Sequence, residues 1–321
     1  MRVAYIINQN NPYTYAGITV ANGFRNAFLN LGHVFEYFDI KALKSEFWKK
    51  KEFNRLLSYD PDLIFASVDD LNILNLKLLP PTKFVLWGAF YKECNYEGQA
   101  QTVLKRTKRK LNDFSNKHHI IIWAQHSEQL IEDFFSGYRN ELGLKIIQLM
   151  HCADDGKIQQ PQLHSDYDFL WIGNISHRLE TYKEFIEPLK TITANYKEYT
   201  EHNKIAPEEV ENQALYKKAF LSPNVHTKAQ IQFNMGLNER VFSSSLMGGF
   251  QICDNNLAKN YFQSDELIVL SRKDEFIDAF YYYKDHPSMR LEMILKMQQN
   301  ILKNHTYKNR IAQIFDVMEL T

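Results

Sequence analysis

The sequence has few of the features that would mark a secreted or membrane-spanning protein. Only three of its 321 residues are cysteine, and Cys94, Cys152 and Cys253 lie far apart. An odd number of widely spaced cysteines forms neither a disulfide framework nor a zinc-binding pattern. No apolar run approaches the roughly 18 residues of a membrane-spanning helix, and the apolar start at residues 3–7 is too short for a signal peptide. We therefore expect a cytoplasmic protein with reduced thiols and no transmembrane segment.

An excess of charge of either sign is missing as well. The 38 Lys and Arg residues balance the 38 Asp and Glu residues, so the formal net charge is zero. Global charge therefore indicates no nucleic-acid partner, and aromatic residues are too sparse in the basic segments for a nucleic-acid platform. A composition of 45% hydrophobic and 24% charged residues is that of a globular protein. The length fits two domains of about 150 residues each.

The first half of the chain alternates short apolar runs with helical patterns. This alternation predicts a parallel sheet that helices cover on both faces. The first run is not followed by the Gly-x-Gly-x-x-Gly fingerprint, which argues against a nicotinamide-dependent dehydrogenase. The predicted strands are residues 3–7, 34–39, 63–66, 84–87, 120–123 and 145–149, and predicted helices include 52–57 and 130–138.

Polar residues follow several of these predicted strands. Ligands bind beyond the carboxyl ends of parallel strands, which selects the loop of Asn11 and Gly17, the pair Asp69-Asp70, and His126. His126 is the candidate general base, because it follows a buried strand and an imidazole titrates near neutrality. The alternative is a histidine that is hydrogen-bonded within the fold. Asp69-Asp70 is either a catalytic pair or, more commonly, a cap of the next helix.

The second half is organised around residues 236–254. This stretch predicts a loop, a short helix from about Glu239 to Met247, a Gly-Gly break, and a short buried strand that ends near Asp254. A helix start presents free backbone N–H groups, which suits a diphosphate, and the guanidinium of Arg240 can bind phosphate oxygens with two parallel hydrogen bonds. Asn238 precedes the helix, where it is expected to cap the helix and to touch a ligand.

The same stretch resembles the C-terminal signature of CgeB-like (spore maturation protein-like) glycosyltransferases. Five residues fall into register with that signature, namely Asn238, Arg240, Phe242, Gly248 and Asp254. Two positions depart from it: Ser243 replaces a Glu that is expected to contact the donor ribose, and Leu246 replaces an Ala. The match extends over residues 145–321, with a terminal His-Thr-Tyr-x-x-Arg motif at residues 305–310.

This resemblance implies an α/β protein of the GT-B fold, with two Rossmann-like domains whose parallel sheets face each other across a cleft. Residues 1–153 would form the acceptor domain and residues 154–303 the nucleotide-sugar donor domain. Residues 304–321 would form a helix that crosses back to the first domain. The donor nucleotide and diphosphate would lie near Gly173, Arg178, His226, Asn238, Arg240, Ser243 and Ser244. An ion pair at the surface is the alternative for Arg178.

The implied activity is transfer of a sugar from a nucleotide-diphosphate sugar, most commonly a UDP- or GDP-sugar, to an unknown cell-surface glycan, lipid or protein. The resemblance implies neither a metal nor another cofactor, and Asp60-Pro61-Asp62 is interpreted as a turn rather than as an Asp-x-Asp metal motif. Two alternatives remain open: a sugar-nucleotide epimerase of the same fold, and a catalytically silent sugar-nucleotide-binding protein. The basic segments Lys49–Lys51 and Lys105–Lys110 are either solvated helix faces or weak membrane-surface contacts.

Overall fold

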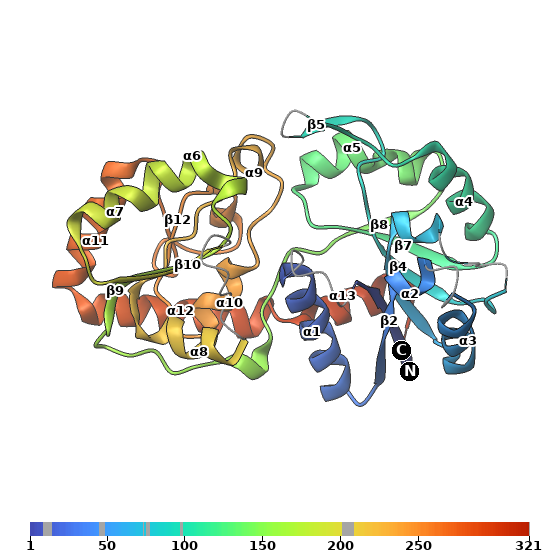
Figure 1. Ribbon diagram of the computed structural model, residues 1–321, viewed down its shortest axis with the longest axis horizontal. Helices are drawn as coiled ribbons and strands as arrows, with labels where there is room; N and C mark the ends of the chain where they lie inside the picture. The colour runs from blue at the N-terminus through green and yellow to red at the C-terminus, as the bar shows by residue number, and fades with distance from the viewer. Residues whose placement is uncertain are drawn as a thin grey trace. The chain divides into compact units, whose positions relative to one another are not determined.

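The protein divides into two compact units (Figure 1). Its computed structural model describes residues 1–8, 15–44, 49–72, 74, 78–96, 99–200 and 209–320. Unit 1 consists of Met1–Met150 and Lys308–Thr321, and unit 2 consists of His151–Tyr307. The limits expected from the sequence, at residues 153 and 303, differ from these by a few residues. Each unit contains its own parallel sheet, as predicted for two Rossmann-like domains.

Unit 1 is built on a six-stranded sheet in the order β2-β1-β3-β4-β7-β8. All neighbouring strands are parallel, and the central strands are almost continuously buried, which explains their apolar runs. The strands are β1 (Arg2–Ile7), β2 (Val34–Asp39), β3 (Leu63–Ser67), β4 (Lys83–Trp87), β7 (His119–Ala124) and β8 (Lys145–Gln148). A separate antiparallel hairpin is formed by β5 (Cys94–Tyr96) and β6 (Gln99–Gln101).

Helices connect these strands and cover both faces of the sheet (Figure 1). The C-terminal helix α13 packs beside α1, where the ring of Phe315 lies 6.2 Å from that of Phe28. The chain therefore ends in unit 1. The helical elements of this unit are α1 (Tyr15–Asn30), α2 (Ile40–Lys44), α3 (Lys49–Tyr59), η1 (Val68–Asn72), α4 (Lys105–Ser115), α5 (Glu128–Asn140) and α13 (Tyr307–Met318). Within the described ranges, no helix combines the length and the apolar character that a bilayer span requires.

Unit 2 contains a smaller parallel sheet. Three strands run in the order β10-β9-β11, with β9 at Tyr167–Ile172, β10 at Tyr196–Tyr199 and β11 at Ala219–Leu221. β12 (Ile252–Cys253) pairs with β13 (Ile268–Val269), and a parallel bridge between Asn224 and Cys253 joins the two sets. The strand expected over residues 219–226 is shorter than predicted. Pro223 has no N–H to donate, so regular pairing stops before it.

The helices of unit 2 pack on this sheet through a large aromatic core. Phe185 and Phe276 from two helices meet at 4.6 Å between ring centroids, and both belong to the same buried cluster as Trp171 of β9. The helical elements are η2 (Asp155–Lys157), η3 (Ser176–Arg178), α6 (Leu179–Thr181), the π-helix η4 (Tyr182–Ile186), α7 (Glu187–Ile192), α8 (Glu209–Lys218), α9 (Lys228–Gln232), α10 (Arg240–Leu246), η5 (Asn256–Asn260), α11 (Lys273–Asp285) and α12 (Pro287–Asn304).

Because β9, β11 and β12 are parallel, their carboxyl ends lie at one edge of the sheet. The loops that follow these strands begin at Gly173, Ser222 and Asp254, and the start of α10 is bonded to the second of them through Asn238. Most of the residues that the sequence analysis selected in this half therefore gather at one edge.

Candidate functional site

Arg240 lies at the carboxyl end of β9. It is the first residue of α10, and its Nη1 donates a hydrogen bond to the carbonyl oxygen of Ile172, the last residue of that strand. The guanidinium carbon lies 4.9 Å from the ring centroid of Trp171, within cation–π distance. A Cβ atom on Gly173 would lie 3.0 Å from Nη1 and 3.4 Å from the guanidinium carbon. The absence of a side chain at Gly173 therefore leaves room for the guanidinium of Arg240. The sequence analysis selected these two residues separately, and the structure places them in contact.

The guanidinium of Arg240 is not fully satisfied by hydrogen bonds. Its Nη2 is buried and has no hydrogen-bond partner among the described residues. Burial lowers the pKa of Arg240, whereas Tyr216, Glu239 and Asp254 favour the charged form, and an arginine keeps its charge in proteins. A buried donor without a partner costs about 1–3 kcal/mol. Arg240 is thus a charged group with capacity for a further hydrogen bond.

A small cavity of about 10 Å³ adjoins Arg240. This volume holds about one water molecule, so it is far too small for a nucleotide. The hydroxyl of Ser222, which also lines the cavity, is buried and has no partner among the described residues. The other lining residues are Leu170, Ile172, Tyr216, Pro223, Asn224, Ser244 and Gln251. This cavity therefore does not itself hold a nucleotide.

His226 is fully buried, and both of its ring nitrogens are engaged. Nδ1 lies 2.6 Å from Oδ1 of Asp254, and the backbone N–H of Asn238 donates to Nε2 at 3.0 Å. Burial lowers the pKa of His226, although Asp254 opposes this effect. The ring is therefore neutral, with its proton on Nδ1. This side chain ties the loop before α10 to the end of β12, and the donor contact that the resemblance implied stays a prediction.

Asn238 takes part in the same network instead of capping α10. Its side-chain amide donates to Oδ1 of Asn224 at 3.0 Å and to the carbonyl of Val225 at 3.1 Å. The N-cap position is Glu239, which forms no side-chain cap. The prediction that Asn238 caps the helix is therefore wrong, because the amide is consumed by the loop that precedes α9.

The first amides of α10 are also bonded within the chain. Val241 donates to the carbonyl of Asn238 at 3.1 Å, and Phe242 and Ser243 donate to that of Glu239 at 3.0 and 3.1 Å. The bonds of Val241 and Phe242 use N–H groups that an α-helix usually leaves free at its start, whereas the bond of Ser243 is the ordinary first bond of the helix. The amides of Val241 and Phe242 are therefore not free for a ligand here, and the diphosphate site at this helix start stays a prediction.

The two serines of α10 are engaged inside the helix. The hydroxyl of Ser244 donates to the carbonyl of Arg240 at 2.7 Å, one turn earlier, and its residue is 1% exposed. The hydroxyl of Ser243 forms a hydrogen bond with the carboxyl group of Glu239. Both hydroxyls are therefore engaged within α10 in this arrangement, and the phosphate contacts expected of Ser243 and Ser244 stay a prediction.

Arg178 lies in η3, in the loop that follows β9 and Gly173. Its charge is one of the influences that lower the pKa of His226, which places it electrostatically close to that ring. The hydroxyl of Thr181, one turn further on, donates to the carbonyl of His226 at 2.7 Å. The loop with Arg178 is therefore joined to the His226 loop, and its contact with a donor stays a prediction.

In unit 1, His126 lies after β7, at the carboxyl end of the sheet as expected. Its ring stacks on Phe90 with 5.6 Å between centroids and 12° between planes, and the side chain is partly buried. Its role as a general base stays a prediction. Gly17 lies in the first turn of α1 and not in a loop, so the interpretation of a loop glycine is wrong. Asn11 lies outside the described residues.

Comparisons with known proteins agree with this architecture. A family model described as glycosyl transferase-like matches residues 164–316. A glycosyltransferase from Rickettsia africae ESF-5 matches 98% of this chain and 97% of its own, with 8% identity and a TM-score of 0.53. The β-glucosyltransferase of phage T4 matches 99% of this chain and 98% of its own, with 12% identity and a TM-score of 0.57. The chain has the GT-B fold.

A third GT-B structure, of an Anabaena protein in complex with UDP-glucose, matches 99% of this chain and 100% of its own, with 11% identity and a TM-score of 0.52. A comparison of the sequence with functionally curated proteins finds no significant match. The family match covers residues 164–316 alone, and the narrower CgeB-like resemblance stays a prediction.

The sequence analysis did not select Glu239 of unit 2 as a site residue. Burial raises the pKa of its carboxyl group, while its hydrogen bond with Ser243 and the charges of Lys157 and Arg240 lower it. Ser243 stands where the CgeB-like signature has Glu, and Glu239 lies one helical turn before it. The sequence signal that could have identified Glu239 is a carboxyl residue four positions before Ser243, on the same side of the helix.

One group of described residues has metal-binding side chains close together. Single ligand atoms of His226, Cys253 and Asp254 lie within 4.8 Å of one another. Burial raises the pKa of the Cys253 thiol, and Sγ accepts a hydrogen bond from the N–H of Asn255 at 3.5 Å. All three side chains are used in hydrogen bonds, and the thiol is held neutral. This group is therefore better explained as part of the loop network than as a metal site.

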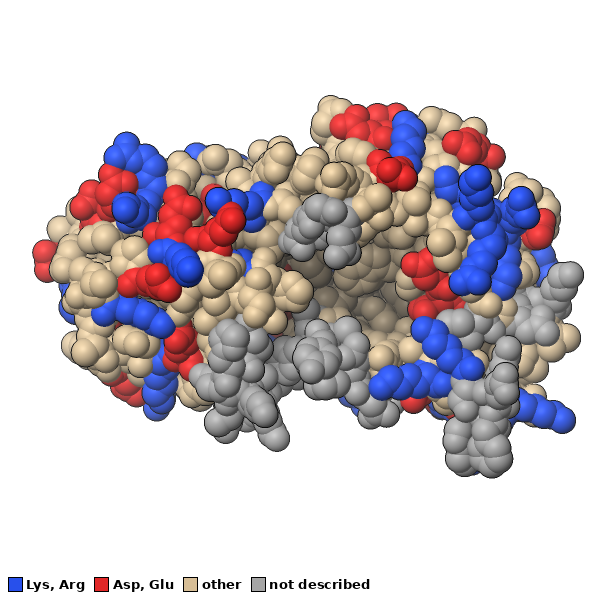
Figure 2. Space-filling view, turned by 45° about the horizontal axis from the view of Figure 1, so that its top comes forward, with Lys and Arg blue, Asp and Glu red and all other residues tan. Residues whose placement is uncertain are grey.

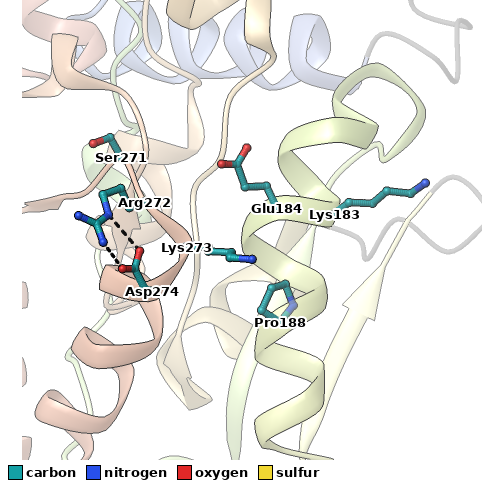
Figure 3. Close-up of a pocket in the computed structure, with 7 residues that line it drawn as sticks. All are labelled: Lys183, Glu184, Pro188, Ser271, Arg272, Lys273 and Asp274. Carbon is teal, nitrogen blue, oxygen red and sulfur yellow. Dashed lines mark hydrogen bonds and ion pairs between the residues drawn. The ribbon is translucent and has the colours of Figure 1, made fainter.

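A second depression of unit 2, with a volume of about 350 Å³, lies between η4, α7 and the start of α11 (Figure 3). Its charges have mixed sign, and Arg272 is paired with Asp274 at its rim. Its lining residues are Lys183, Glu184, Pro188, Ser271, Arg272, Lys273 and Asp274. Arg272 is 67% exposed and already paired with Asp274, so it offers no buried charge that would bind a particular ligand in this depression.

Proposed function

We propose that the protein is a glycosyltransferase that moves a sugar from a nucleotide-diphosphate sugar to an acceptor hydroxyl group. The observation that carries this proposal is Arg240, whose charged guanidinium lies at the carboxyl end of β9 against Gly173 and has an unsatisfied N–H group. Arg240 also lies within residues 164–316, the part of the chain that matches the glycosyl transferase-like family model. The donor would bind to unit 2 and the acceptor to unit 1.

In the proposed reaction, the acceptor oxygen attacks the anomeric carbon of the donor sugar. The bond between that carbon and the phosphate oxygen breaks, and the bonding electrons leave with the nucleoside diphosphate. Negative charge grows on the diphosphate, so a fixed cation stabilises the transition state more than the ground state. Arg240 would exchange the Ile172 carbonyl for phosphate oxygens, and Arg178 would add a second positive charge.

The proton of the acceptor hydroxyl needs a base on the acceptor side. His126 is proposed for this role in an inverting reaction, because it follows β7 at the carboxyl end of the unit 1 sheet. We further propose that the reaction needs no bound metal, since the arginines would balance the charge of the diphosphate. Turnover that persists in excess EDTA would support this, and restoration of activity only by added Mg²⁺ or Mn²⁺ would contradict it.

A uridine nucleotide is the first donor to test, because a GT-B structure similar to this chain is a complex with UDP-glucose; GDP-sugars come next. An α-glucosyltransferase with a similar fold was determined with UDP and DNA. The basic segments Lys49–Lys51 and Lys105–Lys110 have few aromatic side chains on which bases could stack, so we propose a glycan, lipid or protein acceptor in preference to DNA.

The direct test is a thermal-shift panel of UDP-, GDP-, CDP- and dTDP-sugars, followed by product analysis. A stabilising donor that is transferred or slowly hydrolysed supports the proposal. A donor that binds without any turnover would favour a silent sugar-nucleotide-binding protein, for which the engagement of Ser243 with Glu239 is the supporting observation. Conversion of the donor into its epimer without an acceptor would identify an epimerase. Binding of no sugar nucleotide would contradict the proposal.

A further inference from the structure

The outer side of α4 carries a compact group of cations that the donor site does not use. Residues 105–110 contain five Lys and Arg residues. Three of them, Lys105, Arg106 and Arg109, are exposed and form no ion pair with any residue in the described part of the chain. We call these three residues the cationic face. Figure 2 shows Lys and Arg side chains gathered in the region of α4, at the right of the view.

The other two cations of this segment hold α4 in place. Nζ of Lys108 donates to the carbonyl of Tyr91 at 2.8 Å and lies 3.6 Å from the ring centroid of that residue. Nζ of Lys110 donates to the carbonyl of Asn72 at 3.0 Å. The opposite side of the helix is buried in unit 1. The cationic face is therefore presented by a fixed helix and not by a free segment.

One exposed leucine adjoins the start of this face, and another lies near the C-terminal end of α4. Leu104 is the N-cap residue of α4 and is 48% exposed. Leu78 is 60% exposed, and the next residue, Leu79, accepts a hydrogen bond at 2.6 Å from Nζ of Lys117, just beyond the C-terminus of α4. Cations next to exposed apolar side chains are the combination that binds the interface of an anionic bilayer, because charge attraction and apolar burial act together.

We propose that the cationic face and Leu104 dock unit 1 on a membrane surface that contains anionic lipids. A nucleic acid is the weaker candidate, because the cationic face has no aromatic side chain on which bases could stack and would leave the leucines unused. The net charge of the whole chain does not oppose this docking, since unit 1 contains 21 Lys and Arg residues against 17 Asp and Glu residues. The proposal does not depend on the donor site.

The test is co-sedimentation of the full-length protein with vesicles of phosphatidylcholine alone or mixed with phosphatidylglycerol. The main variant carries Lys105→Glu, Arg106→Glu and Arg109→Glu. The matched control carries Lys183→Glu, Lys259→Glu and Lys273→Glu, which change the net charge equally at exposed positions of unit 2. A third variant, Leu104→Ser, keeps the charge and places a good helix-capping residue at the N-cap. Circular dichroism establishes that all variants are folded.

We expect binding to the mixed vesicles and not to phosphatidylcholine alone. The triple variant of the cationic face should bind about 100-fold more weakly, from a factor of about five for each cation, while the unit 2 control should bind like the wild type. Leu104→Ser should weaken binding several-fold. No binding by the wild type, or equal loss in the unit 2 control, would overturn the proposal. Stronger binding to duplex DNA with no effect of Leu104→Ser would assign the cationic face to nucleic acid instead.

Discussion

The contact between Gly173 and Arg240 gives the sharpest prediction about the donor site. In Gly173→Ala, the new methyl group would meet Nη1 of Arg240 at 3.0 Å and Nη2 at 3.4 Å. The guanidinium is the flexible end of a side chain, so it should move while the backbone stays in place. It would then lose its hydrogen bond to Ile172 and its position over Trp171.

The size of this effect follows from the bond that a displaced guanidinium could no longer form with the diphosphate. A hydrogen bond from a charged donor contributes about 1.5–3 kcal/mol, so we expect the affinity for a sugar nucleotide to fall about 10- to 100-fold. The free energy of unfolding should change by less than about 1 kcal/mol, since the displaced group gains hydration.

Isothermal titration calorimetry with the donor from the panel measures this change, and urea unfolding measures stability. Gly156→Ala is the matched control: Gly156 is exposed in the same unit, and its nearest contact would be Oδ1 of Asp154 at 3.3 Å. Gly156→Ala should bind donor like the wild type. Wild-type affinity in Gly173→Ala would refute the argument that Gly173 positions Arg240, and so would an equal loss in the control.

Three further predictions concern named side chains. Asp254→Ala should lower the free energy of unfolding by about 3 kcal/mol or more in urea titrations, because it leaves buried donors of His226 unpaired; a loss below about 1 kcal/mol would contradict the network. Burial lowers the folded-state pKa of His226 below 6.5, so the unfolded state binds more protons than the folded state as the pH falls below 6.5, and the free energy of unfolding should decrease there. The thermal midpoint of His226→Gln should depend less on pH over this range than that of the wild type. An unchanged dependence would reject this explanation. His126→Ala should reduce transfer about 10²- to 10⁴-fold with donor affinity unchanged; full activity would exclude His126 as the base.

The elements of the fold were predictable where local patterns decide them. Apolar runs located the strands of unit 1, and the helix expected from Glu239 to Met247 is observed as α10 at Arg240–Leu246. The first turn of α1 was missed at Gly17, because glycine favours loops in isolation and only the surrounding structure keeps it helical. β11 ends before Pro223 for a purely local reason, because proline has no N–H to donate to a neighbouring strand.

The candidate site was predictable as a location but less so as a set of contacts. The carboxyl-end rule brought Gly173, Arg240 and His226 to one edge of the sheet. The partners of individual side chains depend on residues far away in the sequence, as in the bond between His226 and Asp254. No spacing rule shows that Ser244 bonds back to Arg240 in preference to a ligand. Polar residues at a ligand edge therefore divide into those that bind and those that hold the binders in place.

The central claim is that Arg240 binds the diphosphate of a sugar nucleotide. It is tested most directly by the affinities of UDP and UMP for the wild type and for Arg240→Ala, measured by calorimetry at one salt concentration. The account predicts that the wild type prefers UDP by about tenfold or more, as expected for one charged hydrogen bond, and that this preference disappears in Arg240→Ala. An undiminished preference for UDP in Arg240→Ala would contradict the account.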